Sequence, residues 1–238
     1  MKKDILGTAL LDYQKGNYSE DIVTYSSLDE EDIMPLPYLF RSFKEMPLLE
    51  KKALQLCKGH ILDIGAGAGA HSLHLQQQNK NVTALEISKG AADVLKQRGI
   101  KQVLHEDIYQ LQGPKFDTLL ILMNGIGIVG TLARISDFFA HAKTLLQPNG
   151  QILIDSSDII YMFEADDDGG YWIPDNNTYY GEVTFTMSYK GQKGTPFSWL
   201  YIDYNTLQRS AIANGFDCEL IQEGEHFDYL AKLTLASQ

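Results

Sequence analysis

Residues 61–72 read Ile61-Leu62-Asp63-Ile64-Gly65-Ala66-Gly67-Ala68-Gly69-Ala70-His71-Ser72. The apolar run at its start predicts a buried strand, and residues 70–77 predict a helix that begins almost at once. The glycines between them must form a tight turn, because a residue without a Cβ lets the backbone reverse sharply and lets its N–H groups approach a ligand. The segment therefore predicts a strand–turn–helix unit that binds a ligand on its turn.

Asp63 narrows the choice of ligand. Gly65, Gly67 and Ala70 also match the G-x-G-x-x-A pattern of dinucleotide-binding turns. A carboxylate beside the turn would repel a diphosphate, so Asp63 favours a ligand with a positive charge at this end. An amino acid attached to a nucleoside meets that requirement.

The composition is that of a soluble globular protein. The chain has 238 residues, of which 44% are hydrophobic, and a formal net charge of −11. The negative charge would repel phosphate backbones and anionic lipids, so we expect neither nucleic acid nor membrane as a partner. Cys57 and Cys218 lie far apart without metal-ligand spacing, and no apolar run is long enough to span a bilayer. We therefore expect buried thiols and a cytoplasmic location.

Strands and helices alternate along most of the chain. Apolar segments predict strands at 61–64, 82–85, 102–104, 116–123, 151–155, 218–223 and 226–235, and helices at 47–58, 70–77, 89–98, 132–146 and 205–214. Such an order predicts right-handed crossovers between parallel strands. We therefore expect an α/β fold with a doubly wound, mainly parallel seven-stranded sheet and an antiparallel C-terminal strand.

Four regions follow from this pattern. Residues 1–46 are predicted to be an N-terminal helical cap, 47–158 the ligand-binding α/β core, 159–203 a substrate loop and β-hairpin insertion, and 204–238 a helix and strand pair that complete the core. The acidic and aromatic loop 161–180 and the N-terminal helices are the expected substrate determinants. Five residues of this loop approximate the spacing of a calcium-binding loop: Glu164, Asp166, Asp168, Gly169 and Asp175. A calcium-binding loop ends on a bidentate Glu, whereas this segment has Asp175 there, so we expect no metal.

Polar side chains follow the ends of the five predicted core strands, namely Asp63, Glu86, Asp107, Asn124 and Ser156. In open parallel sheets, ligands bind at this edge. Glu86 lies about 20 residues beyond the glycines, where an acidic side chain can accept both ribose hydroxyls. Glu86 or Asp107 could instead simply cap the next helix.

Taken in order, these motifs resemble those of class I S-adenosylmethionine-dependent methyltransferases across about residues 47–158. The resemblance implies that Gly65, Ala66, Gly67 and Gly69 pass beneath the methionyl part of S-adenosylmethionine, with Asp63 near its amino group. It also implies donor contacts at the other strand ends, with Glu86 on the ribose, Ile87 beside it, Asp107 on the adenine amine, Ile108 against the adenine, and Asn124 beside the sulfonium. Arg41 could pack over this site or lie on the surface. His71 could touch the ligand, but a position on the surface of its helix is the expectation.

The function implied by the resemblance is methyl transfer to the nitrogen, oxygen or carbon of a small molecule. Asn124 is not followed by Pro-Pro-Tyr or Pro-Pro-Phe, which weakens the case for DNA bases or protein glutamine as acceptors. Asn124, Asp158 and Tyr38 are candidate catalytic residues, with His226 as a further candidate base, and the sequence does not choose among them. A Rossmann-type NAD(P)-dependent oxidoreductase and a noncatalytic S-adenosylmethionine-binding module are the alternatives.

Overall fold

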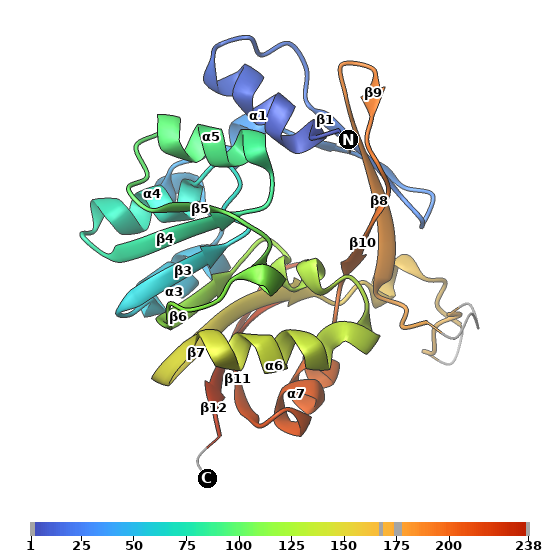
Figure 1. Ribbon diagram of the computed structural model, residues 1–238. Coiled ribbons are helices and arrows are strands. Elements are labelled where there is room, and N and C mark those ends of the chain that lie inside the picture. The colour runs from blue at the N-terminus through green and yellow to red at the C-terminus, as the bar shows by residue number, and fades with distance from the viewer. Residues whose placement is uncertain (1–2, 167–168, 174–177, 237–238) are drawn as a thin grey trace.

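A seven-stranded sheet forms the centre of the computed structural model, which describes residues 3–166, 169–173 and 178–236 (Figure 1). The strand order is β11-β12-β7-β6-β3-β4-β5. The strands are β3 (His60–Ile64), β4 (Asn81–Glu86), β5 (Val103–His105), β6 (Phe116–Ile121), β7 (Leu146–Ser157), β11 (Phe216–Glu223) and β12 (Asp228–Leu235). β3 to β7 pair in parallel, whereas β12 runs antiparallel to both of its neighbours. The predicted mainly parallel sheet with an antiparallel C-terminal strand is confirmed.

Helices cover both faces of this sheet (Figure 1). They are α3 (Leu48–Leu56), α4 (Ala70–Gln77), α5 (Lys89–Gln97), α6 (Ile135–Leu145) and α7 (Tyr204–Ala213). Successive residues of a strand point to opposite faces, so Leu119 packs with the α6 and α7 cluster while Leu120 packs with the α3 and α4 cluster. Burial on both faces explains why β6 reads as a continuous apolar run.

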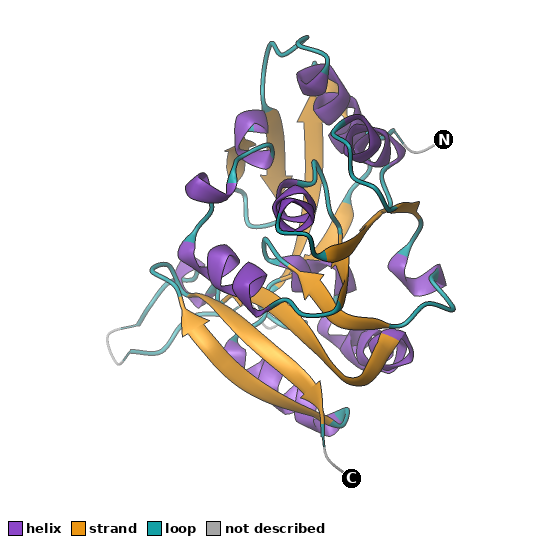
Figure 2. Cartoon of the chain, turned by 90° about the vertical axis from the view of Figure 1, so that its left-hand side faces the viewer, coloured by secondary structure: helices purple, strands orange, loops and turns teal. Residues whose placement is uncertain are grey.

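A second sheet stands beside the carboxyl edge of the core (Figure 2). Its order is β10-β8-β1-β2, with the short β9 paired to β8. The strands are β1 (Ile22–Ser26), β2 (Glu31–Met34), β8 (Glu182–Tyr189), β9 (Gln192–Lys193) and β10 (Phe197–Leu200). The predicted hairpin of the insertion is therefore present, and it is extended by two strands from the N-terminal region.

The N-terminal region differs from the expected helical cap. It contains α1 (Ile5–Gln14) and the short α2 (Leu36–Leu39), but β1 and β2 lie between them. β1 pairs with β8, so that Thr24 lies opposite Met187. β1 also pairs with the nearby β2, with Ile22 opposite Met34. Pairing with a strand as distant as β8 leaves little trace in local periodicity, which explains why the sequence predicted a helical cap here.

Short 3-10 helices occupy several connections: η1 (Phe43–Glu45), η2 (Ile108–Gln110), η3 (Gly125–Val129), η4 (Leu132–Arg134) and η5 (Ile160–Met162). The second sheet touches the core at η3, where the ring of Trp199 lies so close to Gly127 that a Cβ would find no room. In the described ranges no helix is long and apolar enough to cross a bilayer.

Candidate active site

The glycine-rich turn between β3 and α4 is open on its outer side. Gly65, Gly67 and Gly69 all have left-handed backbone conformations, with φ values of +73°, +55° and +84°. A Cβ at Gly65 would meet nothing within 4 Å, and one at Gly67 would meet only the Gly65 carbonyl oxygen at 3.9 Å. At Gly69 the methyl of Leu95 fills this space instead. The first two glycines therefore leave room for a ligand, while the third lets α4 and α5 pack closely.

Glu86, at the end of β4, is bound to this turn. Its two carboxylate oxygens accept hydrogen bonds from the backbone N–H groups of Gly67 and Ser88, each at 2.8 Å. Burial raises the pKa of Glu86, and these backbone hydrogen bonds partly oppose that rise. Ser88 caps α5, because its Oγ accepts from Ala91 N at 3.1 Å. Glu86 is therefore not the helix cap, and each of its oxygens keeps a lone pair for a ligand hydroxyl.

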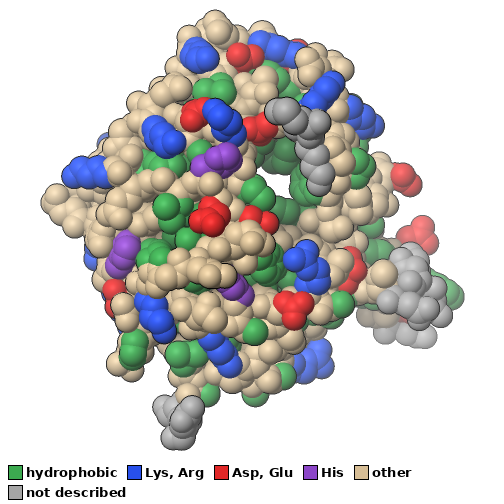
Figure 3. Space-filling view, in the orientation of Figure 1, with side chains coloured by type: hydrophobic (Ala, Val, Ile, Leu, Met, Phe, Trp, Pro, Cys, Tyr) green, Lys and Arg blue, Asp and Glu red, His purple; other side chains and the backbone are tan. Residues whose placement is uncertain are grey.

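A cavity of about 830 Å³ adjoins Glu86. Ile87 and His105 line it on the core side, and Met187 and Phe197 line it on the side of the second sheet. The Ile87 side chain is 67% exposed, which leaves an apolar surface for a ligand to cover. Hydrophobic side chains are visible inside the hollow of the molecular surface in Figure 3.

The other core residues that were predicted to bind S-adenosylmethionine lie at the same edge of the sheet. Asp63 is buried under the turn and accepts from Ser72 Oγ at 2.6 Å, and burial raises the pKa of Asp63. Asp107 accepts from Tyr109 N at 3.0 Å and so caps η2, as one interpretation of the sequence anticipated. Ile108 follows it and is buried.

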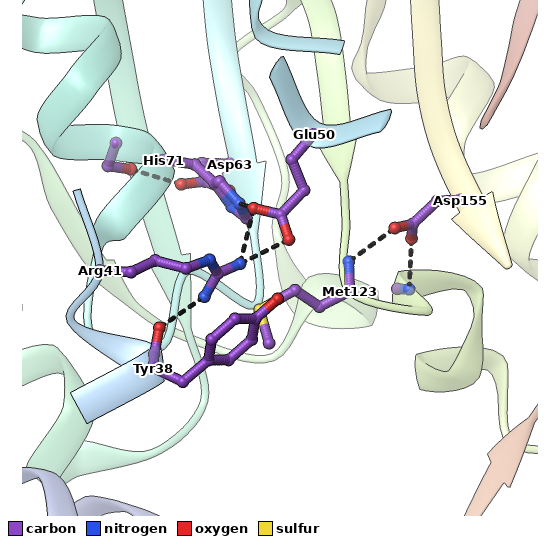
Figure 4. Close-up of polar contacts among 9 residues, drawn as sticks. Tyr38, Arg41, Glu50, Asp63, His71, Met123 and Asp155 are labelled. Carbon is purple, nitrogen blue, oxygen red and sulfur yellow. Dashed lines mark hydrogen bonds and ion pairs between the residues drawn. The ribbon is translucent and has the colours of Figure 1, made fainter. Parts of the chain in front are cut away.

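Arg41, Glu50 and His71 form a buried cluster near the end of β3 (Figure 4). Arg41 Nη2 donates to both oxygens of Glu50, at 2.5 and 2.6 Å, and His71 Nε2 lies 2.8 Å from Glu50 Oε2. Burial alone would raise the pKa of Glu50, but His71 and Arg41 outweigh it and lower the pKa. Arg41 is not a surface residue, and the expectation that His71 lies on the helix surface is wrong.

One nitrogen of the Arg41 guanidinium, Nε, makes no hydrogen bond within the described residues. Its Nη1 donates to the Tyr38 carbonyl oxygen at 2.8 Å, and its guanidinium carbon lies 4.0 Å from the centre of the Tyr38 ring. Its Nε is buried, and no acceptor for it exists among the residues that the structure describes. A buried donor without a partner is costly, so Nε is suited to an acceptor on a ligand.

Asp155 holds the turn that follows β6. Its two oxygens accept from the backbone N–H groups of Met123 and Gly125, both at 3.0 Å (Figure 4). Met123 and Asn124 both have left-handed backbones, with φ values of +68° and +52°, and these hydrogen bonds stabilise that strained geometry. Burial raises the pKa of Asp155 to about 7. Asn124 Oδ1 accepts from Ser157 Oγ at 2.8 Å, so its side chain is held at the same edge.

Two of the candidate bases, Asp158 and His226, lie close in the fold, because Asp158 N donates to the carbonyl oxygen of Phe227 at 2.9 Å. Tyr38 lies over Arg41, is 40% exposed and has a pKa that burial raises. Asp158 follows β7 and accepts from Tyr180 Oη at 2.7 Å, and His226 is exposed in the turn before β12. Of the calcium-like set, Asp168 and Asp175 lie outside the described residues, and the described part of the chain holds no cluster of three or more metal-ligating side chains.

Sequence reasoning missed Glu50 and Asp155 as members of this site, and it gave a place near the ligand for His71 only as an alternative. Asp155 had a usable signal, because it directly follows the apolar residues 152–154 of its strand, as Asp63 follows Ile61 and Leu62. Glu50 had none, since a glutamate in the first turn of a helix is ordinarily solvated.

The comparisons with known proteins give the following matches. A family model described as a methyltransferase domain matches residues 62–154. The crystal structure of an S-adenosylmethionine-dependent methyltransferase from Bacteroides fragilis, in complex with S-adenosyl-L-homocysteine, is 45% identical, with a TM-score of 0.92 and coverage of 99% of this chain and 96% of that one. A search of curated proteins finds no match.

More distant structures share the fold. The CcbJ methyltransferase from Streptomyces caelestis is 14% identical with a TM-score of 0.62, covering 82% of this chain and 95% of that one. DesVI from Streptomyces venezuelae is 18% identical with a TM-score of 0.57, covering 85% of this chain and 96% of that one.

Proposed function

This chain belongs to the S-adenosylmethionine-dependent methyltransferases and uses S-adenosylmethionine as its methyl donor, and from that premise we propose how its residues hold the donor and that the acceptor is a small molecule. The observation that carries the proposal is the hydrogen bond between Glu86 and Gly67 N beside an open glycine turn. This hydrogen bond holds the turn and the carboxylate side by side, which supports the proposal that both contact one ligand.

S-adenosylmethionine would lie along the carboxyl edge of the sheet, from its methionyl part at the end of β3 to its adenine at the ends of β4 and β5. Gly65, Ala66, Gly67 and Gly69 would lie under the methionyl part, and the negative charge of Asp63 would favour its amino group. Glu86 would accept hydrogen bonds from the ribose hydroxyls. The adenine would cover the exposed Ile87 and rest near Ile108, with Asp107 close to its amine. The unpaired Nε of Arg41 would donate to the methionyl carboxylate.

The chain's own residues have mainly to position the acceptor and exclude water. When bound, the donor supplies a methyl sulfonium that is already activated and whose charge disperses as the methyl leaves. The turn at Met123 and Asn124, held by Asp155, forms the edge that the acceptor approaches. Because burial raises the pKa of Tyr38, its hydroxyl stays protonated near neutral pH and would orient the acceptor rather than take its proton.

A small molecule suits the entrance to this site better than a polymer. The second sheet stands beside the carboxyl edge and touches η3 at Gly127, which restricts access to Asn124. The formal net charge of −11 argues against nucleic acid as a partner, and we place the protein in the cytoplasm.

Two experiments test this function. Mass spectrometry of ligand released from the purified protein should find S-adenosylmethionine or S-adenosylhomocysteine, and labelled methyl should pass into a small molecule of a cell extract. Tight binding of a nicotinamide dinucleotide with no heat from S-adenosylhomocysteine would contradict the proposal. Donor binding without any labelled product would favour a noncatalytic binding module.

A further inference from the structure

Four aromatic side chains form a strip on the second sheet: Phe185 on β8, Phe197 and Trp199 on β10, and Tyr201 just after it. The ring centre of Phe185 lies 6.2 Å from that of Phe197 and 6.3 Å from that of Tyr201. The rings of Phe197 and Trp199 pack edge to face, with their centres 6.2 Å apart. All four are half-buried, so each ring still presents surface. We call this set the aromatic strip.

The aromatic strip faces the core. Residues directly opposite in a sheet point to the same side, and Phe185 is opposite Phe197 as Val183 is opposite Trp199. Trp199 touches the core at Gly127 in η3, which begins directly after Asn124. Phe197 also lines the cavity that Glu86 borders. The strip therefore runs along the hollow between the two sheets, visible in Figure 3, from the acceptor edge toward the ribose end of the donor.

The charge on this inner face is negative. Among the inward-facing positions of β1, β2, β8 and β10, all of them described, the charged residue is Asp32, which lies opposite Thr24 and on the same side as Met187. Burial raises the pKa of Tyr201 to about 12, and the charge of Asp32 contributes to that rise. Across the hollow, the charge of Arg41 is already paired with Glu50. Aromatic faces attract cations and carry no attraction for anions.

We propose that the methyl acceptor is a small amine that also carries a planar or apolar ring. Its ring packs on the aromatic strip, and its ammonium form is attracted by the ring faces and by Asp32, which is exposed to solvent. The ammonium loses one proton to solvent before transfer, and the nitrogen lone pair then forms the C–N bond as the C–S bond of the sulfonium breaks, leaving S-adenosylhomocysteine. This inference rests on the proposed function, because the strip recognises an acceptor only if the edge at Asn124 is where methyl transfer occurs. Anionic acceptors are disfavoured, since they would approach Asp32 without meeting a cation among the described inward-facing residues of the second sheet. In the adjoining cavity Lys89 is paired with Asp93, and Lys3 lies among the carboxylates of Asp4 and Glu86.

Tryptophan fluorescence gives a direct test. The chain has two tryptophans, so Trp172→Phe leaves Trp199 as the sole reporter. The full-length variant, saturated with S-adenosylhomocysteine, is titrated with 4-nitrobenzylamine and with 4-nitrobenzoate, which share a quenching ring and carry opposite charges at neutral pH. We expect the amine to quench Trp199 with a half-saturation at least tenfold lower than that of the benzoate. n-Butylamine has the charge without the ring. It should displace 4-nitrobenzylamine only at a concentration about tenfold higher than the half-saturation of 4-nitrobenzylamine itself.

A matched pair of further substitutions locates the binding surface. Phe185→Leu in the same background should raise the half-saturation for the amine at least fivefold. Tyr25→Leu should leave it unchanged, because Tyr25 lies opposite Thr186 on the outer face of the same sheet. Equal or tighter binding of the benzoate, or an amine titration insensitive to Phe185→Leu, would overturn the proposed acceptor class.

The same samples separate this inference from the proposed function. Calorimetry with S-adenosylhomocysteine reports donor binding independently of the strip. Normal donor binding without a preference for the amine rejects the acceptor class alone, whereas loss of donor binding in the parent protein rejects the donor site itself.

Discussion

Glu50→Gln is expected to destabilise the protein strongly. Glu50 is 4% exposed and carries the negative charge that compensates Arg41, itself 5% exposed. Removing one partner of a buried ion pair leaves the other charge unpaired and costs about 3 to 5 kcal/mol. For a chain of this size, each kcal/mol corresponds to roughly 2 to 4 °C in the melting temperature. We therefore expect a decrease of roughly 6 to 20 °C, measured by circular dichroism at pH 7.

An exposed ion pair in the same protein supplies the control. Lys89 and Asp93 are 2.8 Å apart on α5, with side chains that are 75% and 37% exposed. Asp93→Asn should leave the melting temperature unchanged within error, because solvent screens such pairs. If Glu50→Gln also left it within about 2 °C of the parent, the buried cluster would not be an electrostatic unit and the reasoning would fail.

Three further predictions concern the donor edge and pH. Glu86→Gln should weaken S-adenosylhomocysteine binding at least tenfold, about 1.4 kcal/mol, in calorimetry, whereas Glu106→Gln at an exposed position should not; equal affinities would refute the ribose role. Gly67→Ala and Gly99→Ala both place a Cβ on a left-handed backbone and should each cost about 1 to 2 kcal/mol of stability, but only the former should abolish donor binding in the same titration. Between an unfolded pKa of 3.8 and a folded pKa of about 7, Asp155 binds more protons in the folded state, so its contribution to stability falls as pH rises. The free-energy advantage of the parent over Asp155→Asn in urea denaturation should thus shrink by up to about 4 kcal/mol from pH 4 to pH 8, and a constant or growing advantage would contradict the raised pKa.

The core fold could be predicted because its signals are local. The apolar run before Gly65 and the polar residue after each strand depend on neighbours in sequence, and they placed Glu86 at the donor edge. The role of each predicted donor residue stays a prediction.

The second sheet and the buried cluster were not predictable in the same way. β1 pairs with its neighbour β2, and both join the second sheet because β8 returns to β1 from a distant part of the chain. Glu50 and His71 look like polar positions of two separate helices, and only the packing of α3 against α4 makes them a buried pair. Asp155 was visible as a charge in an apolar strand, but its partners Met123 N and Gly125 N belong to another strand's turn.

The separation of the two sheets has a consequence for how such an enzyme can diversify. The glycine turn and Glu86 belong to the seven-stranded sheet, whereas the rings facing the acceptor edge come from β8 and β10, and Trp199 among them packs against Gly127 of η3. Substitutions among those rings can remodel which molecule is accepted without disturbing the residues that grip the donor. Selection can therefore alter substrate choice by changing one layer of the molecule while the other remains as it is.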